Sequence, residues 1–303
     1  MWGMRMDAPR VAIIISTYNW PEALTRVLES ALAQTERRFE IVVADDGSRK
    51  ETADAVERVL RPAAVPWFHV RQEDTGFRQS RVRNLGVRYS RASWLVFVDH
   101  DTLLHRDFVA DHLRLAGEAT FTQGKRCFLP EARTGELLAG GLVGRWWPWP
   151  WSAGLENRKN AIRCRMLGGL FTRARTFQTS IRGCNLGVSR KDFLRVDGFD
   201  EFYDGVWGRE DSDFCYRLFH AGVRCRNAAF SALQAHLFHR TVKRVGRDRW
   251  DDELEKVLVE RRIRALRGFS AMDSEGMLVS AWAGHEGSES GAVVKVPRES
   301  KPR

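Results

Sequence analysis

Short, largely apolar runs alternate with amphipathic segments through the N-terminal part of the chain. Four runs have the composition of buried strands: 11–15, 41–44, 67–70 and 94–98. Three segments between them carry apolar residues at helical spacing: 21–32, 53–60 and 81–89. This alternation predicts an α/β fold with a parallel sheet and helices on both of its faces.

Polar side chains stand where three of these strands are expected to end. Thr17 follows the first strand, the pair 45–46 follows the second, and Asp99 and Asp101 follow the fourth. Ligands of open parallel sheets bind at the carboxyl ends of the strands, so we expect these groups to meet. In an extended segment alternate side chains share a face, which would let Asp99 and Asp101 point the same way. Two such carboxylates suit Mg²⁺ or Mn²⁺, although Asp is also common in simple polar turns.

Composition limits the class of protein and its partners. The net charge of +10 and the pI of ≈ 9.8 allow a nucleic acid, an anionic membrane surface or a phosphorylated substrate. Because arginines are scattered and no helix-turn-helix, zinc-finger or RNP pattern is present, we do not expect nucleic-acid binding. No apolar run approaches the roughly 18 residues of a membrane helix. The start of the sequence also lacks the apolar core of a secretory signal.

The five cysteines show no CxxC-type spacing. A zinc site or a disulfide framework is therefore not expected. Free thiols in a reducing, cytoplasmic compartment are the better interpretation.

The second half of the chain is less regular than the first. A helix is predicted from Trp250 to Leu266, because apolar residues recur there on one face. From Ser270 onward the chain is rich in Ser, Gly, Glu and Lys, which predicts a loosely ordered tail.

Five segments occur in a fixed order and carry the most specific motifs: 13–19, 42–48, 76–86, 97–101 and 205–214. Together they resemble the family-two glycosyltransferases of the GT-A fold, over roughly residues 10–240. The later part resembles the galactosyltransferase-type C-terminal segment of chondroitin polymerases and polypeptide N-acetylgalactosaminyltransferases. The resemblance implies a mostly parallel twisted sheet flanked by helices, with a C-terminal helical extension.

The resemblance also implies a division of the chain. Residues 1–245 would form the nucleotide-sugar transferase domain, with a donor half at about 1–125 and an acceptor half at about 126–245. Residues 246–303 would hold the C-terminal helix and the tail.

Nucleotide-sugar binding is assigned by the resemblance to six residues: Thr17, Asp46, Arg78, Arg83, Asn84 and Asp99. A carboxylate such as Asp46 can accept a hydrogen bond from a uracil N–H or a ribose hydroxyl, and Arg binds phosphate oxygens. From the residues alone, Asp46 is equally well a turn residue, and the arginines equally well form a solvated helix face.

The metal-binding motif of the family corresponds to Asp99 and Asp101, with Asp101 as the direct ligand and Asp99 nearer the ribose. A third ligand is expected from His236 or His239, and we favour His236. The implied cofactor is Mn²⁺ or Mg²⁺, which would neutralise the leaving diphosphate. The alternative for either histidine is an ordinary core or surface residue.

Glu210 and Asp211 match the ED motif of the family, in which the Asp is the general base. An inverting transfer needs a carboxylate near the acceptor hydroxyl, on the side of the anomeric carbon opposite the leaving group. Asp211 takes that role by this match, and Glu210 would accept a hydrogen bond from the acceptor. Acidic residues at this point would also suit the start of a helix.

Contacts with the acceptor are expected from Trp207, Arg209 and Trp149. Trp149 belongs to a Trp-rich loop at 146–151, whose aromatic faces could stack on sugar rings. Trp is also common at membrane interfaces, and basic residues near this loop favour a headgroup contact. A loop folded onto the core is the third interpretation.

These features predict a metal-dependent inverting glycosyltransferase of hexosyl or N-acetylhexosaminyl type, with a UDP-sugar as the expected donor. The acceptor would be a glycan or a lipid-linked molecule. The enzyme would work in the cytoplasm or at the cytoplasmic face of an anionic membrane. The alternatives are a retaining enzyme of similar fold and a protein that binds nucleotide-sugars or glycans without turnover.

Overall fold

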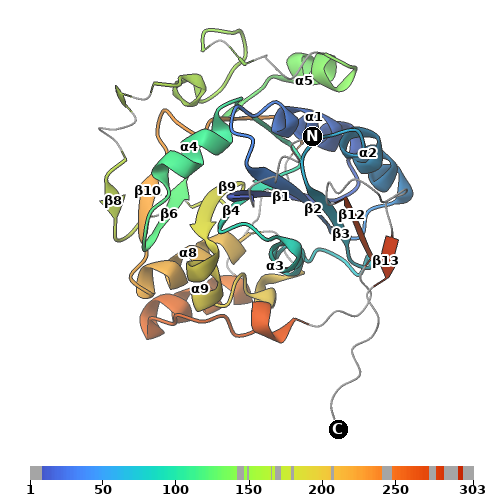
Figure 1. Ribbon diagram of the computed structural model, residues 1–303. Coiled ribbons are helices and arrows are strands. Elements are labelled where there is room, and N and C mark those ends of the chain that lie inside the picture. Colours follow the sequence, from blue (N-terminus) through green and yellow to red (C-terminus); the bar gives the residue numbers. More distant parts are fainter. Residues whose placement is uncertain are drawn as a thin grey trace, which may run out of the picture.

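A central sheet with helices on both faces organises the chain (Figure 1). The computed structural model describes residues 9–141, 147–148, 150–164, 166–167, 172–178, 181–205, 208–240, 248–272, 278–282 and 293–295. Within these residues no helix is both long enough and apolar enough to cross a membrane.

The described strands form one large sheet and one small one. The large sheet has the order β13-β12-β3-β2-β1-β4-β9-β6-β10-β8. Its strands are β1 (Val11–Thr17), β2 (Phe39–Asp45), β3 (Trp67–Arg71), β4 (Trp94–Asp99), β6 (Thr120–Gln123), β8 (Ala174–Arg175), β9 (Asn185–Ser189), β10 (Arg224–Asn227), β12 (Leu278–Trp282) and β13 (Val293–Lys295). The small sheet has the order β5-β11-β7, with β5 (Thr102–Leu104), β11 (Gln234–His236) and β7 (Arg126–Phe128).

Most pairings in the centre of the large sheet are parallel. β1 pairs in parallel with β2 and β4, and β2 pairs in parallel with β3. β9 interrupts this pattern, because it runs antiparallel to both β4 and β6. Because β9 is antiparallel to both of its neighbours, β6 and β10 run in the same direction as β1–β4, so the sheet is mixed but most of its strands are parallel, as the sequence predicts.

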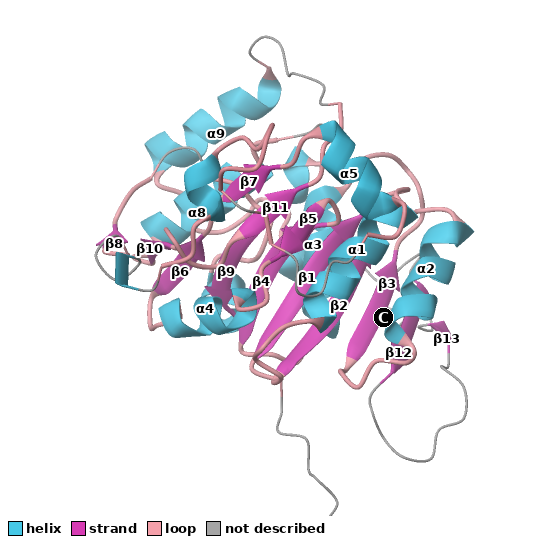
Figure 2. Cartoon of the chain, turned by 90° about the horizontal axis from the view of Figure 1, so that it is seen from above, coloured by secondary structure: helices cyan, strands magenta, loops and turns pink. Residues whose placement is uncertain are grey.

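Helices cover the two faces in separate groups (Figures 1 and 2). One face carries α1 (Pro21–Leu32), α2 (Lys50–Leu60), α4 (Phe108–Leu115) and α5 (Glu131–Leu138). The other carries α3 (Gln79–Tyr89), α7 (Arg190–Arg195), α8 (Glu210–His220) and α9 (Arg249–Glu260). Short 3₁₀ turns lie at η1 (Arg158–Ala161), η2 (Glu201–Tyr203) and η3 (Phe269–Ala271).

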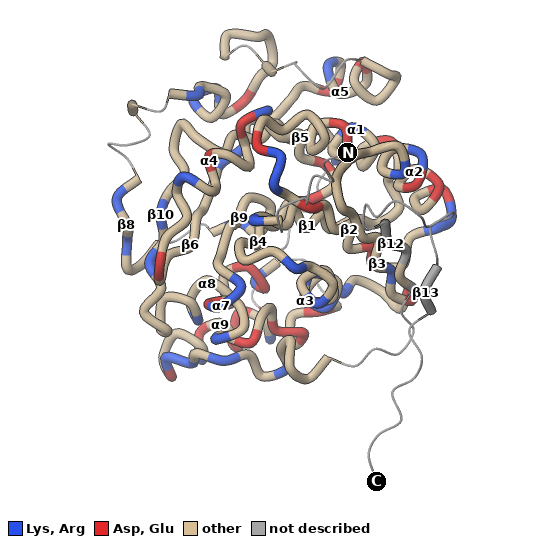
Figure 3. The backbone as a smooth tube through the Cα atoms, viewed as in Figure 1, with Lys and Arg blue, Asp and Glu red and all other residues tan. Residues whose placement is uncertain are grey.

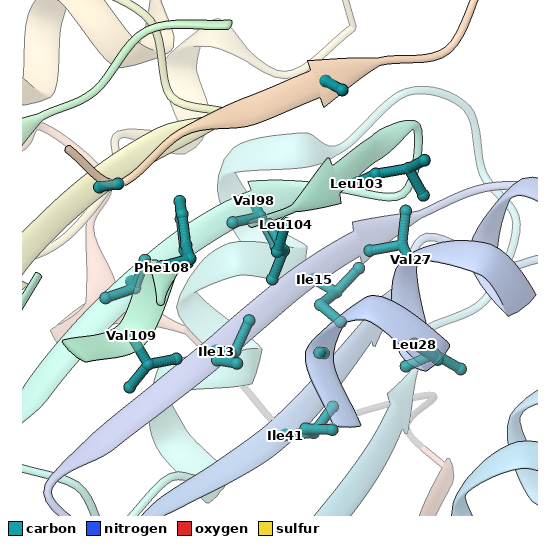
Figure 4. Packing of buried hydrophobic residues seen from close by; sticks show 14 of the residues in the cluster. Ile13, Ile15, Val27, Leu28, Ile41, Val98, Leu103, Leu104, Phe108 and Val109 are labelled. Carbon is teal, nitrogen blue, oxygen red and sulfur yellow. The ribbon is translucent and has the colours of Figure 1, made fainter. Parts of the chain in front are cut away.

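The alternation of side chains along β1 explains why both faces need helices. Ile13 and Ile15 point into the core beneath α1, where Ile15 lies near Val27 (Figure 4). Ile14 belongs to the opposite core, beneath α3. A Cβ at Gly86 of α3 would come within 2.7 Å of the Ile14 side chain, so the glycine lets α3 pack closely on β1. A strand that is buried on both faces reads as a continuous apolar run.

The four predicted strands and the three helices between them are confirmed as β1–β4 and α1–α3. Their register also brings the polar strand ends together, as expected. Thr17 lies beside Asp45 across β1 and β2, and Ser16 lies beside Asp99 across β1 and β4.

Two predictions for the C-terminal part are wrong. The helix expected to reach Leu266 ends at Glu260, because Arg261 adopts a left-handed conformation (φ 52°) and the Leu266 side chain is exposed. The tail is not loose throughout, since β12 pairs antiparallel with β3 and β13 pairs with β12. β12 is held in place by backbone hydrogen bonds to the edge of the sheet at β3, and composition alone does not reveal such pairing.

The cysteines are free thiols, as predicted. Four of them are buried: Cys127, Cys184, Cys215 and Cys225. Burial raises the pKa of the Cys127, Cys184 and Cys225 thiols to about 12, so they remain protonated near neutral pH.

Candidate functional site

A cavity of ≈ 200 Å³ opens at the carboxyl ends of β1 and β4. Its lining includes several of the residues predicted from the sequence: Thr17, Asp46, Asp99 and Asp101. The Oγ1 atom of Thr17 is buried and has no hydrogen-bond partner in the part of the chain that the structure describes. A buried hydroxyl without a partner is costly, so a ligand group in this cavity would satisfy it.

Asp46 is held in a fixed orientation on the wall of this cavity. One carboxylate oxygen accepts a hydrogen bond from the backbone N–H of Arg78 at 2.8 Å, and the other accepts one from the Gln72 amide. Burial raises the pKa of the Asp46 carboxyl, against the lowering effect of these hydrogen bonds. The guanidinium of Arg78 donates to the Glu73 carbonyl, so Arg78 meets Asp46 through its backbone.

Arg83 connects the two acidic motifs at the centre of the site. Its side chain is only 2% exposed, and its two terminal nitrogens lie 3.2 Å from Asp99 Oδ1 and 3.2 Å from Glu210 Oε1. Its Nε donates to Ser16 Oγ at 3.3 Å. Burial alone would lower the pKa of Arg83, but Asp99, Glu210 and Asp211 raise it. The guanidinium is therefore a fixed positive charge among three carboxylates.

Asn84 is not among the described residues that line the cavity, so its contact with the nucleotide stays a prediction. It is fully buried. Its amide nitrogen donates to the Phe199 carbonyl at 2.9 Å, and its amide oxygen accepts the Phe199 N–H at 2.9 Å. This paired contact fastens α3 to the segment before α8. The side chain that follows Arg83 on a helix points away from it, and sequence alone could not reveal which of the two enters the site.

Asp101, His236 and His239 form a cluster at the edge of the cavity. The Nε2 atoms of His236 and His239 lie 3.2 and 3.1 Å from Asp101 Oδ2. The ligand atoms of all three residues lie within 4.8 Å of one another. Burial favours a high pKa for Asp101, but the hydrogen bonds from the two histidines hold that pKa well below its usual value.

The small sheet explains how residues so distant in sequence meet. β5 pairs antiparallel with β11, which puts His236 opposite Thr102, next to Asp101. The N–H of Leu237 then donates to the Asp101 carbonyl at 2.8 Å. His239 joins three residues later, so the structure brings both candidate histidines to the carboxylate instead of one.

These residues fit a divalent cation. Within the described ranges Asp101 Oδ1 is buried without a hydrogen-bond partner, and a carboxylate with two imidazoles is a common donor set for such ions. Asp99 is not part of this cluster. β4 ends at Asp99 and the chain turns at His100 and Asp101, so the alternation expected of an extended strand does not apply.

Glu210 and Asp211 begin α8, on the other side of Arg83. Asp211 is oriented by two backbone groups: its Oδ2 accepts the Gly183 N–H at 2.9 Å, and its Oδ1 accepts the Ser212 N–H at 2.7 Å. Burial raises the pKa of both carboxyls, and for Glu210 burial and the nearby Asp211 raise it to about 7. Neighbouring buried carboxylates with raised pKa values are typical of acid–base chemistry.

Of the three residues predicted to contact an acceptor, the structure describes Arg209. Arg209 is exposed and pairs with Asp251 of α9 at 2.6 Å, so it links two helices in this structure. Trp207 and Trp149 lie outside the described residues. In the Trp-rich loop, Trp147 donates to the Ala161 carbonyl at 2.8 Å, whereas Trp151 is 68% exposed.

Arg126 and Trp20 are neighbours of the site that sequence reasoning missed. Arg126 lies on β7 with a terminal nitrogen 3.0 Å from Cys184 Sγ. Burial alone would lower the pKa of Arg126, but Cys184, Asp99 and Asp101 raise it. Trp20 contacts the rings of His100 and His239 edge to face, at 6.0 and 5.8 Å between centroids. Trp20 directly follows the first motif, and this position could have identified it as a neighbour of the site. No sequence pattern marks Arg126.

Comparison with known proteins places this geometry in a family. Residues 12–136 match the model described as glycosyl transferase family 2, and residues 171–241 match the model described as the N-terminal domain of galactosyltransferase. The validoxylamine A glucosyltransferase of Streptomyces hygroscopicus subsp. jinggangensis is 30% identical over 236 residues, which cover 74% of this chain and 54% of that protein. Escherichia coli chondroitin synthase is 28% identical over 242 residues, covering 72% of this chain and 33% of that protein. The chain thus spans about half the length, or less, of these two relatives.

Solved structures with a similar fold include the mannosyltransferase PcManGT from Pyrobaculum calidifontis in complex with GDP-Man and Mn²⁺. It is 20% identical, has a TM-score of 0.51, and the match covers 76% of this chain and 57% of that one. S. aureus TarS 1–349 in complex with UDP-GlcNAc is 15% identical with a TM-score of 0.53, covering 83% and 66%. At such identities the likeness concerns the fold alone. The ordered motifs, the fold and the two matching models together place this chain in glycosyl transferase family 2, with the GT-A fold and a galactosyltransferase-type C-terminal segment.

Proposed function

We propose that the chain is a metal-dependent glycosyltransferase that moves a sugar from a nucleotide-sugar to a hydroxyl of a glycan or lipid-linked acceptor. The observation that carries the proposal is the contact of Arg83 with both Asp99 and Glu210. This contact connects Asp99, which lines the proposed nucleotide-binding cavity, with Glu210 and its neighbour Asp211, the carboxylates suited to acid–base chemistry. Relatives named as glycosyltransferases support the same class of reaction.

The donor side of the proposal rests on Thr17, Asp46 and Asp99. The Asp46 carboxylate can accept from a base N–H or a ribose hydroxyl, and Thr17 has a free hydroxyl for the same ligand. We favour a UDP-sugar, because a single carboxylate acceptor matches the one N–H that uracil offers. Similar folds hold UDP-GlcNAc in TarS and GDP-Man in PcManGT.

Asp101, His236 and His239 would hold the metal ion. Mg²⁺ prefers oxygen ligands, whereas two imidazoles and a carboxylate suit Mn²⁺ better, so we favour Mn²⁺ over Mg²⁺. When bound, such an ion would offset the negative charge of the leaving diphosphate.

Asp211 is the proposed general base. Its two backbone hydrogen bonds fix the carboxylate in place, and its raised pKa favours uptake of a proton. As the acceptor oxygen attacks the anomeric carbon, Asp211 would take the hydroxyl proton while the bond to the diphosphate breaks. Attack from the face opposite the leaving group inverts the anomeric configuration.

A screen of nucleotide-sugars tests the proposal. Purified protein is incubated with each donor and Mn²⁺, and release of the nucleoside diphosphate is measured with and without chelator. Release from at least one donor, lost on chelation, is the expected result. Binding of UDP without release from any donor, with or without candidate acceptors, would favour a binding protein over an enzyme.

Arg83→Lys tests the link between the two motifs. Lysine keeps the charge but cannot reach Asp99, Glu210 and Ser16 together, because it lacks the planar fork of arginine. We expect transfer to fall by about 10²-fold, in line with the effect of small misplacements of reacting groups. Arg88→Lys on the same helix is the matched control, since Arg88 is exposed. Similar rates in both variants would contradict the proposed link.

Membrane contact belongs to the proposal as well, and Trp151 tests it. Exposed apolar side chains are frequent in this part of the chain, including Met166 (86%) and Phe177 (53%). We expect binding to anionic vesicles at low salt, weakened by high salt and by Trp151→Ala in a sedimentation assay. Val259→Ala, an exposed apolar residue on α9, should bind as wild type does. If the protein stays in the supernatant at every salt concentration, the membrane assignment is wrong.

A further inference from the structure

A second cavity, of ≈ 290 Å³, lies at the carboxyl end of β10. Five polar residues of its lining carry the argument: Lys125, Lys159, Asn160, Arg175 and Asn227. In the part of the chain that the structure describes, no acidic residue lines it. None of these residues has been given a role in the proposed chemistry.

Three positive charges surround this cavity without a negative partner. Lys125, Lys159 and Arg175 are exposed, and none of them forms an ion pair with an acidic residue of the described ranges. Basic positions on β8 and β10 can be followed in Figure 3. Like charges around a hollow raise the local positive potential, which attracts an anionic ligand.

Asn227 gives a second, independent sign of a ligand. It is 9% exposed, and its Oδ1 atom is buried without a hydrogen-bond partner among the residues that the structure describes. A buried amide oxygen without a donor is unfavourable, so a hydroxyl on the ligand would satisfy it. The lining is thus complementary to a single ligand that carries both anionic groups and hydroxyl donors.

The position of the cavity relates it to the proposed transfer. Asn227 pairs with Gln123 at the carboxyl ends of β10 and β6, the edge of the sheet where ligands bind. Lys125 directly precedes Arg126, which lies beside Cys184 in the candidate site. Asn160 donates to the Arg126 carbonyl at 2.9 Å, so the lining of this cavity contacts β7, the strand that carries Arg126.

We propose that this cavity binds an anionic saccharide, and that this saccharide is the acceptor. The carboxylate of a uronic acid and the phosphate of a sugar phosphate offer the same chemistry to the cationic side chains. Saccharide hydroxyls supply the donors that Asn227 lacks. Because it names the class of acceptor, this inference rests on the proposed function.

Direct binding, measured by calorimetry with the full chain, tests the inference without requiring turnover. The probes are an oligosaccharide containing glucuronic acid, its carboxyl-reduced neutral counterpart, and the phosphate monoester of that counterpart. UDP with Mn²⁺ is titrated in parallel. Two variants alter the cavity: the double variant Lys125→Glu/Lys159→Glu and the single variant Asn227→Leu. The control is Lys191→Glu, which makes the same Lys-to-Glu change at an exposed position of α7.

We expect the charged probes to bind more tightly than the neutral one. The double charge reversal should weaken the charged probes by about tenfold or more, as expected for loss of charge-assisted hydrogen bonds. Asn227→Leu should weaken all three probes while thermal stability is kept, because an apolar side chain of similar size removes an unpaired polar atom. UDP affinity should be the same in every variant. The better of the two charged probes identifies the anionic group.

Equal binding of charged and neutral probes would overturn the inference. Equal weakening by Lys191→Glu would also overturn it, because the effect would then be one of net charge alone. If Lys125 and Lys159 are needed for anionic vesicles but not for any saccharide, the surface is a lipid contact instead. Absence of UDP binding in the wild type would refute the proposed UDP donor, and absence of release from every donor in the screen would refute the proposed function. Both results leave the saccharide titrations interpretable.

Discussion

Replacing Asp211 with Asn is expected to lower the rate of sugar transfer by about 10²- to 10⁴-fold, the range for loss of a general base. Asparagine keeps the shape of the side chain, and its amide oxygen can still accept one of the two backbone hydrogen bonds. It cannot take the proton of the acceptor hydroxyl. The affinity for the nucleotide-sugar should change little, because Thr17, Asp46 and the metal site lie on the other side of Arg83.

Glu210→Gln is the comparison that separates the two acidic residues. The pKa of Glu210 is raised to about 7 by burial and by Asp211, which alone would make it a second candidate base. However, one oxygen of Glu210 contacts Arg83 and the side chain is only 7% exposed. We expect a smaller loss of transfer in this variant than in Asp211→Asn. Product linkage, determined by nuclear magnetic resonance, should show inversion; a retained configuration or a near-normal rate for Asp211→Asn would refute the assignment of the base.

Replacing Asp101 with Asn should also reduce transfer by about 10²-fold or more, because it removes a charged ligand from the proposed metal site. Affinity for Mn²⁺, followed by electron paramagnetic resonance, should fall in parallel. Asp54→Asn, at an exposed position of α2, is the control for loss of one negative charge. Full activity of the wild type in the presence of chelator would show that no metal is needed.

Further predictions concern the two histidines at this site. Either His236→Ala or His239→Ala should lower Mn²⁺ affinity, since both Nε2 atoms lie near Asp101. An imidazole must be neutral to bind a metal, so Mn²⁺ affinity should fall as the pH falls. Because the hydrogen bond to Asp101 raises the pKa of His239, this loss should begin above the ordinary imidazole pKa of about 6.5. Affinity that stays constant from pH 8 to about pH 5 would argue against histidine ligands.

The first half of the fold follows from local patterns. Apolar runs and helical spacing predict β1–β4 and α1–α3, because these signals depend only on neighbours along the chain. The C-terminal strands β12 and β13 have no such signal. β12 owes its place to backbone pairing with β3, which composition does not encode, and α9 ends at a left-handed Arg261 that its spacing did not predict.

The ends of the predicted strands determined which acids line the donor cavity, since parallel strands deliver their carboxyl ends to one edge. Only the tertiary structure decided how these acids are used. Arg83 meets Glu210 across 127 residues of sequence, and His239 joins His236 at Asp101 through the pairing of β5 with β11. Likewise, Lys125, Lys159, Arg175 and Asn227 come from four separate segments that share one cavity. Local periodicity is a property of a few neighbouring residues, whereas these contacts depend on the path of the whole chain.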